Sequence, residues 1–332
     1  MAGSVTNDSP VVSVVMGVHN GAAELEKTVD AVLRQSFVDL EFIIVNDGST
    51  DDTEVILRDY ESRDHRVVVI HQENQGLTGA LISGSGRVTG QFLARQDIGD
   101  LSHRDRFEKQ IEFLNTHRDV VAVSTGYRRI GPEGEYLGRQ TREMSPKAVT
   151  DALIRQGIGL PHTAAMIRTD AFHRVGGYRA AFRYAQDSDL WYRLAEIGLL
   201  AEIPACLFDW GIDVGGISAS NREKQSLLAG LARKCYDVRQ LGGSESELLE
   251  QANKISWSKQ ATDDVALKTD PTAAAEFFIG SQLYSLGDSR CRRYLRRALA
   301  RHPFWPRAWA KWALSFLKAS NLKASNAPEI QS

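Results

Sequence analysis

The stretch "LEFIIVNDGSTDDTEVILRDY" (Leu40–Tyr60) places an apolar run, a polar turn and an acid-rich segment one after another. The apolar run from Leu40 to Val45 predicts a buried strand. The turn sequence Asp-Gly-Ser-Thr follows it, and Ser49 or Thr50 is expected to cap a helix that opens with acidic residues. The stretch therefore predicts a strand that runs directly into a helix.

Strand and helix alternate in the same way through the first hundred residues. Apolar runs at residues 11–18, 66–71 and 91–96 predict three more strands, and residues 23–35 and 76–88 are expected to be helical. Such alternation is typical of a doubly wound, mostly parallel sheet flanked by helices. The predicted fold class is therefore α/β.

Polar residues follow each of the four predicted strands. They are His19-Asn20, Asn46-Asp47-Gly48, Glu73 to Gly76, and Asp97 to Asp100. Singly, such residues are explained by helix capping or turn formation. Open parallel sheets, however, bind ligands at the carboxyl ends of their strands, where all four groups would meet. Together the four groups predict a ligand site at one edge of the sheet.

The composition is that of an ordinary globular protein. The 332 residues are 42% hydrophobic and 25% charged, and the net charge of −2 gives no general attraction to nucleic acid. The length predicts one large domain and an appendage. Three scattered cysteines, without a C-x-x-C pair, argue against a disulfide framework or a zinc site. No signal peptide or membrane-spanning run is expected, so the predicted location is the cytoplasm.

An ordered set of motifs carries a family resemblance. The segments "VSVVMGVHN", "VNDGSTDDT", "NQGLTGAL", "GQFLARQDIGDLSHRDRFEKQ" and "AQDSDLWYRLAEIG" occur in that order within residues 10–220. As a set they resemble the inverting family-2 glycosyltransferases with the GT-A fold. The resemblance implies a GT-A, Rossmann-like sheet and transfer of a sugar from a nucleotide-diphospho-sugar to an acceptor hydroxyl, usually with a divalent metal.

The resemblance also assigns a donor site. Asp47 looks like the acid that reads the nucleotide base, and its carboxylate could accept the imide N–H of uracil or thymine, which favours a UDP-sugar. The residues that the resemblance assigns to nucleotide-sugar binding are His19, Asn20, Asp47, Asn74, Gly76, Arg95 and Asp97.

Asp187, in "QDSDLW", aligns with the family's proposed catalytic base. Inverting transfer requires one carboxylate to take the proton of the acceptor hydroxyl while the oxygen attacks the anomeric carbon. The alternative is that Asp187 only opens a helix, where the helix dipole favours an acid.

The metal motif departs from the family pattern. The family usually has D-A-D-D where this chain has "DIGD", so Gly99 stands at the position of the principal metal-binding acid. In "FDWGIDVGGIS", Asp213 lies near the place of a family histidine. Asp97, Asp100 and Asp213 are therefore expected to hold Mn²⁺ or Mg²⁺. The alternative is that metal binding is weak or lost.

The region from residue 221 to 332 is predicted to be helical. Residues 290–323 contain ten Lys or Arg and no acid, and "YLRRALARHPFWPRAWAKWALSFL" resembles the helix hairpin of a tetratricopeptide-like unit. One interpretation is a small bundle with solvated arginines. The other is a basic surface that docks on anionic lipid at the inner membrane face. Nucleic-acid binding is not expected, because no base-reading motif accompanies the charge.

The resemblance therefore implies a glycosyltransferase, with a GT-A domain at residues 10–220 followed by a helical region at 221–332. Its expected role is bacterial surface polysaccharide or glycolipid synthesis on a glycan or lipid-linked acceptor. A sugar nucleotidyltransferase would need a basic loop after the first strand, and "GVHNGAAELE" has no Lys or Arg before Lys27. Because of Gly99, a non-catalytic family member that binds a sugar nucleotide or a partner stays as the alternative.

Overall fold

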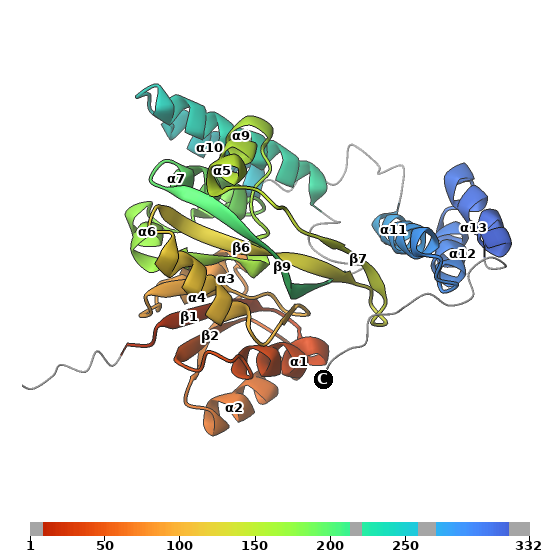
Figure 1. The fold of residues 1–332 in the computed structure, drawn as a ribbon, viewed down its shortest axis with the longest axis horizontal. Coiled ribbons are helices and arrows are strands. Elements are labelled where there is room, and N and C mark those ends of the chain that lie inside the picture. The colour runs from red at the N-terminus through yellow and green to blue at the C-terminus, as the bar shows by residue number, and fades with distance from the viewer. Residues whose placement is uncertain (1–8, 213–220, 258–269, 319–332) are drawn as a thin grey trace, which may run out of the picture. The chain divides into compact units, whose positions relative to one another are not determined.

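The structure is a computed structural model that describes residues 9–212, 221–257 and 270–318. The fold is α/β: a sheet of parallel and antiparallel strands is flanked by helices, and a group of C-terminal helices follows in the chain (Figure 1). The predicted fold class is confirmed. The described residues divide into two compact units: the first comprises residues 9–127, 139–210 and 223–257, and the second comprises residues 128–138, 211–212, 221–222 and 270–318.

The sheet of the described residues has nine strands in the order β3-β2-β1-β4-β8-β6-β9-β5, with β7 paired to β6. Strands β3, β2, β1 and β4 are parallel, whereas β8 is antiparallel to both β4 and β6. The four strands predicted in the first hundred residues are therefore confirmed. The strands are β1 (Val12–Val18), β2 (Leu40–Asp47), β3 (Val67–Gln72), β4 (Phe92–Arg95), β5 (Leu101–Ser102), β6 (Val120–Ile130), β7 (Tyr136–Gln140), β8 (Met166–Arg168) and β9 (Leu199–Gly211).

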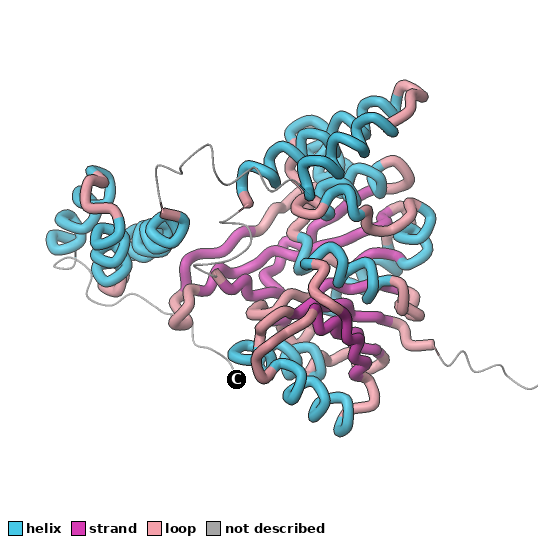
Figure 2. The backbone as a smooth tube through the Cα atoms, turned by 180° about the vertical axis from the view of Figure 1, so that it is seen from behind, coloured by secondary structure: helices cyan, strands magenta, loops and turns pink. Residues whose placement is uncertain are grey.

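Helices cover both faces of the sheet in the first unit, as the tube in Figure 2 shows. Alternate residues of a strand point to opposite faces, so Val15 belongs to one hydrophobic cluster and Val14 and Met16 to the other. The helices are α1 (Ala22–Leu33), α2 (Thr53–Arg63), α3 (Gly76–Ser85), α4 (Arg106–Thr116), α5 (Pro146–Gln156), α6 (Thr169–Arg174), α7 (Gln186–Ala195), α9 (Arg222–Gln240) and α10 (Ser246–Trp257), with short 3₁₀ turns at His162–Ala164 and Ala180–Phe182. No helix of the described residues is long and apolar enough to cross a bilayer.

Helix α3 packs closely on the strands because glycines lie on both sides of the contact, Gly84 in the helix and Gly17 in β1. A Cβ at Gly84 would approach the Val15 Cγ1 to 2.7 Å, and a Cβ at Gly17 would approach the Ala80 Cβ to 2.9 Å. Larger side chains would push the helix away from β1 and β2. This close packing fixes the start of α3, at Gly76, against the carboxyl edge of the sheet.

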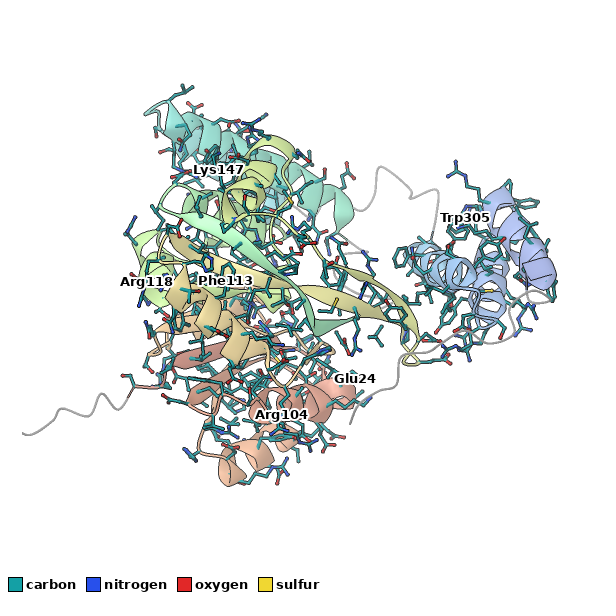
Figure 3. The ribbon with its side chains drawn as sticks, in the orientation of Figure 1. Glu24, Arg104, Phe113, Arg118, Lys147 and Trp305 are labelled. Carbon is teal, nitrogen blue, oxygen red and sulfur yellow. The ribbon has the colours of Figure 1, made fainter. Side chains whose placement is uncertain are left out.

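The second unit contains α11 (Pro271–Leu286), α12 (Cys291–Arg301), α13 (Pro306–Lys318) and the hairpin of residues 128–138. Glu135 of this hairpin is fully buried, and its carboxylate accepts a hydrogen bond from the Tyr294 hydroxyl at 2.7 Å. Trp305, labelled in Figure 3, packs on Phe277 with ring centroids 4.4 Å apart. The unit therefore has a core of its own, to which Leu137 of the hairpin contributes.

Candidate functional site

The loops after β1 and β2 are joined through Asn20. Its backbone is left-handed, with φ of 53°, a conformation that asparagine tolerates better than most residues. The Asn20 N–H donates to the Ser49 Oγ at 3.0 Å, and its Oδ1 accepts from the Thr50 N–H at 2.7 Å. The predicted cap is therefore wrong: α2 begins at Thr53 after Asp52, because Ser49 and Thr50 are engaged by Asn20.

Asp47 holds the loop between β3 and α3. Its carboxylate is buried, and Oδ1 accepts from the Gln72 side-chain amide at 2.7 Å and from the Gln75 N–H at 2.8 Å. Oδ2 accepts from the Gly76 N–H at 2.8 Å. Both oxygens therefore position the first residues of α3, a role that the sequence did not reveal. Contact between Asp47 and a nucleotide base stays a prediction.

His19 and Asn74 lie beside Asp47 on the exposed side of this edge. The His19 Nδ1 is 2.9 Å from the Asp47 carbonyl oxygen and 3.1 Å from the Asn74 Nδ2. The Asn20 Nδ2 is 3.3 Å from the other ring nitrogen of His19. Four of the residues assigned to nucleotide-sugar binding thus lie together, and polar groups of three of them face solvent.

Arg95, at the end of β4, is fully buried. Its Nη1 donates to the Val15 carbonyl oxygen of β1, and its Nη2 donates to the Asp97 Oδ1, with which it forms an ion pair. The Asp97 side chain is 31% exposed, so it is the part of this pair that faces the edge of the sheet. Burying a guanidinium is costly unless a carboxylate and further acceptors stabilise it, and Arg95 has both.

A second buried arginine, Arg106, was not among the predicted site residues. Its guanidinium donates to the Ser102 Oγ at 2.7 Å and to the Arg95 carbonyl oxygen at 2.9 Å. Desolvation and the neighbouring charge of Arg95 lower the pKa of Arg106 to about 9. Arg106 therefore holds the segment that contains Asp97 and Asp100. The only signal in the sequence was its place just after "DIGDLSHRD".

Two of the three predicted metal ligands lie in the turn after β4. Asp100 is 4% exposed, and its Oδ2 accepts from the Thr163 hydroxyl at 2.7 Å. Gly99 lies between Asp97 and Asp100 in the chain. Its φ is 83°, and a Cβ added at this glycine would meet no atom within 4 Å. Asp213 lies outside the described residues. Among the residues that the structure describes, no three His, Cys, Asp or Glu side chains form a group that could hold a metal ion.

Asp187 lies in the first turn of α7, where its Oδ1 accepts from the Ser188 N–H at 2.7 Å. Burial raises the pKa of the Asp187 carboxyl, and the negative charge of Asp97 acts in the same direction. Burial also raises the pKa of Tyr178, on which the charges of Arg95, Asp97 and Asp187 all act. The structure thus brings these groups into one electrostatic neighbourhood.

His162 adjoins the same neighbourhood. Its Nε2 is 2.8 Å from the Tyr178 hydroxyl, and its ring meets Trp191 edge-on. Burial, and secondarily the charge of Arg95, lower the pKa of His162 well below its ordinary value. His162 is therefore neutral at pH 7 and serves as an uncharged hydrogen-bonding partner of Tyr178.

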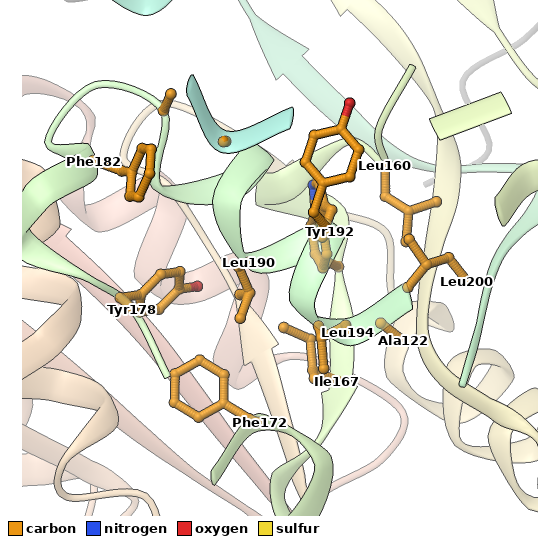
Figure 4. Close-up of a cluster of buried hydrophobic side chains, with 14 of the residues drawn as sticks. Ala122, Leu160, Ile167, Phe172, Tyr178, Phe182, Leu190, Tyr192, Leu194 and Leu200 are labelled. Atoms are coloured by element: carbon orange, nitrogen blue, oxygen red, sulfur yellow. The ribbon is translucent and has the colours of Figure 1, made fainter. Parts of the chain in front are cut away.

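Helix α7 is fixed by a buried group of charges. Asp189, 1% exposed, accepts from the Arg179 Nε at 3.0 Å and from the Arg193 Nη2 at 2.6 Å. Arg179 also pairs with Glu245 at 2.6 Å. Leu190 of the same helix packs in the hydrophobic cluster shown in Figure 4. The start of α7, and with it Asp187, is therefore held rigidly.

Comparison with known proteins gives consistent matches. The sequence profile of Glycosyl transferase family 2 matches residues 13–180. A glycosyltransferase of Bacillus subtilis, EpsE, is 32% identical over 196 residues, which cover 58% of this chain and 69% of EpsE. The teichuronic acid biosynthesis glycosyltransferase TuaG of the same organism is 32% identical over 218 residues, which cover 65% of this chain and 84% of TuaG.

The fold matches solved structures as well. The mannosyltransferase PcManGT from Pyrobaculum calidifontis, in complex with GDP-Man and Mn²⁺, superposes with a TM-score of 0.54 and 18% identity. The superposition covers 94% of this chain and 86% of PcManGT. At this level of identity the match concerns the fold, which is that of the GT-A glycosyltransferases.

The substitution Asp187→Asn is expected to raise the melting temperature at pH 7 to 8. Because the pKa of Asp187 is raised in the folded protein, its ionisation at neutral pH disfavours folding, and the amide removes this cost. Below the pKa of the unfolded carboxyl, about 3.9, both states are protonated and the gain should vanish. Melting temperatures of both proteins from pH 3 to pH 8, without added metal or nucleotide, measure this gain.

Asp170→Asn is the matched control, since Asp170 is an exposed acid in the first turn of α6. It should leave the melting temperature unchanged or lower it slightly. If Asp187→Asn melted at a lower temperature than the wild type at pH 8, the conclusion that the ionised Asp187 destabilises the folded protein would be contradicted.

Proposed function

The chain belongs to Glycosyl transferase family 2, and from this membership we propose that it transfers a sugar from a nucleotide-diphospho-sugar to an acceptor hydroxyl with inversion. The observation that carries the proposal is the place of Asp187 in the first turn of α7, where burial and, to a smaller extent, the charge of Asp97 raise the pKa of its carboxyl. A carboxylate whose pKa lies above its ordinary value accepts a proton more readily and suits general-base catalysis.

In the proposed reaction, Asp187 takes the proton of the acceptor hydroxyl. The acceptor oxygen then forms a bond to the anomeric carbon from the face opposite the diphosphate, and the bond between that carbon and the diphosphate oxygen breaks. Attack from the opposite face inverts the anomeric centre. The rigid mounting of α7 through Asp189 supports this role, because a general base must be held at a fixed place relative to the acceptor.

The donor is proposed to bind along the carboxyl edge of the sheet. The nucleoside would lie against His19, Asn20 and Asn74, whose positions depend on the hydrogen bonds of Asp47 to the start of α3. Gly76, Arg95 and Asp97 would complete the nucleotide-sugar site. A UDP-sugar is favoured, because the imide N–H of its uracil base could donate a hydrogen bond to a carboxylate or carbonyl oxygen of the site.

A divalent cation, Mn²⁺ or Mg²⁺, is proposed to accompany the donor. Asp97 and Asp100 supply hard oxygen ligands of the kind both ions prefer, and Asp97 is exposed enough to reach one. Such a cation would stabilise negative charge on the leaving diphosphate. Asp100 would have to exchange its bond to Thr163 for the cation, or act through that bond.

The acceptor is proposed to be a growing bacterial surface polysaccharide or a glycolipid. The relative TuaG is named for teichuronic acid biosynthesis, which is the basis of this assignment. The enzyme would then work in the cytoplasm, at the inner membrane face when the acceptor is lipid-linked.

The C-terminal helices are proposed to contact anionic lipid at that face. Phe304, Trp309 and Phe316 are 90%, 48% and 49% exposed, and α12 carries the exposed Arg296 and Arg297. Aromatic side chains among clustered cations are typical of peripheral membrane surfaces.

Asp187→Asn tests the reaction most simply. Sugar transfer should fall by roughly 10²- to 10⁴-fold, the usual contribution of a general base. The affinity for UDP or GDP should stay within about twofold, because Asp187 acts on the acceptor. Transfer assays and calorimetry on both proteins give the two quantities. Transfer at the wild-type rate would show that another group is the base.

The metal proposal is tested at Gly99. We expect Mn²⁺ to tighten UDP binding by the wild-type protein, and Gly99→Asp to add little, since a further carboxylate would repel the diphosphate and any side chain is strained at a φ of 83°. Gly99→Asn, with the same strain and no charge, is the control. A wild type indifferent to Mn²⁺, with metal dependence appearing only in Gly99→Asp, would contradict a working site and favour the non-catalytic alternative.

Vesicle sedimentation tests the lipid contact. The protein should sediment with vesicles that contain anionic lipid and remain in solution with neutral vesicles, and high salt should release it, because the attraction is screened. Equal partition with both kinds of vesicle would contradict the proposal.

A further inference from the structure

Arg183 is a cation whose guanidinium donates to no acceptor among the residues that the structure describes. Its main chain, in contrast, is fixed on both sides. The Arg183 N–H donates to the Ser256 Oγ of α10 at 3.2 Å, and its carbonyl oxygen accepts from the Thr78 hydroxyl of α3 at 2.6 Å. The side chain therefore starts from a rigid point between two helices.

The guanidinium is also held in place. Its Cζ lies 4.6 Å from the ring centroid of Trp257, which is 56% exposed. On its other side it adjoins Gly76, where a Cβ would come within 2.9 Å of the Arg183 Nη2. Stacking on an indole orients a guanidinium without using its N–H groups. Within the part of the chain that the structure describes, the N–H donors of Arg183 thus remain available beside the loop that contains Asn74.

Two other arginines of this unit, Arg95 and Arg179, have acidic partners. Arg95 pairs with Asp97, and Arg179 pairs with both Asp189 and Glu245. At Arg183 a positive charge is positioned at the edge of the sheet, and no carboxylate of the described residues pairs with it. Such an arrangement suits an anion supplied by a ligand.

We propose that Arg183 binds the diphosphate of the nucleotide-sugar donor. The inference rests on the proposed function, because it takes the donor to lie along this edge. Arg183 lies next to Gly76, at the proposed nucleoside end, and four residues before Asp187, at the proposed acceptor end. Because the diphosphate joins the nucleoside to the sugar, it is expected to lie between the nucleoside end at Gly76 and the acceptor end at Asp187. A planar guanidinium can donate two parallel hydrogen bonds to phosphate oxygens and stabilise the charge of the leaving group.

The test is calorimetric titration of the wild type and of Arg183→Gln with UDP, GDP and inorganic pyrophosphate. Loss of a charge-assisted pair should weaken the binding of all three by about tenfold or more at low salt. The difference should shrink at high salt. Arg183→Lys should bind more tightly than Arg183→Gln but less tightly than the wild type, since lysine keeps the charge and lacks the two parallel N–H donors of a guanidinium. Arg58→Gln, which removes an exposed arginine of α2, should change nothing.

Two outcomes separate this proposal from the one on which it rests. A wild type that binds none of the three probes would overturn the proposed function and Arg183's role with it. Binding by the wild type that Arg183→Gln leaves unaltered would overturn the role of Arg183 alone. If Arg183→Gln fails to fold, Trp257→Leu decides, because it keeps the charge and removes the stacking partner. Weaker pyrophosphate binding by Trp257→Leu supports the proposal, and unchanged binding contradicts it.

Discussion

The buried guanidinium of Arg95 is the constraint on which the site depends. It is withdrawn from water at the centre of the sheet edge, where its ion pair with Asp97 and its bond to β1 stabilise it. Desolvation by burial is the larger cause of the lowered pKa of Arg106 and of His162, and the charge of Arg95 lowers both further. Asp97 in turn contributes to the raised pKa of Asp187. One desolvated ion pair therefore links the end of β4 to the residues around it, including the proposed base.

Much of the first unit could be predicted from sequence, because periodicity and strand-end chemistry are local signals. The strand from Leu40 and the polar residues after it lie where the pattern places them. The cap of α2 could not be predicted, since Ser49 and Thr50 are claimed by Asn20, some thirty residues away in the chain. Arg183 gave no signal either, because its stacking on Trp257 depends on how α10 packs.

The region after residue 221 shows the same limit at a larger scale. Helices could be predicted there from the sequence, but helical periodicity does not show which hydrophobic core a helix packs into. Leu228 and Cys235 of α9 are buried in the core of the first unit, whereas Leu283 and Tyr294 belong to the core that includes Leu137 of the distant hairpin. A single boundary in the sequence could not describe this division, because each unit is assembled from separate segments.

The most direct test of the proposed donor site is a crystal structure of the protein with UDP and Mn²⁺. The nucleoside should lie against His19 and Asn74 and the diphosphate between Asp97 and Arg183, with an open path from the sugar position to Asp187. A nucleotide bound away from the carboxyl ends of β1, β2 and β4, or with its diphosphate turned away from Asp97, would contradict the proposed site.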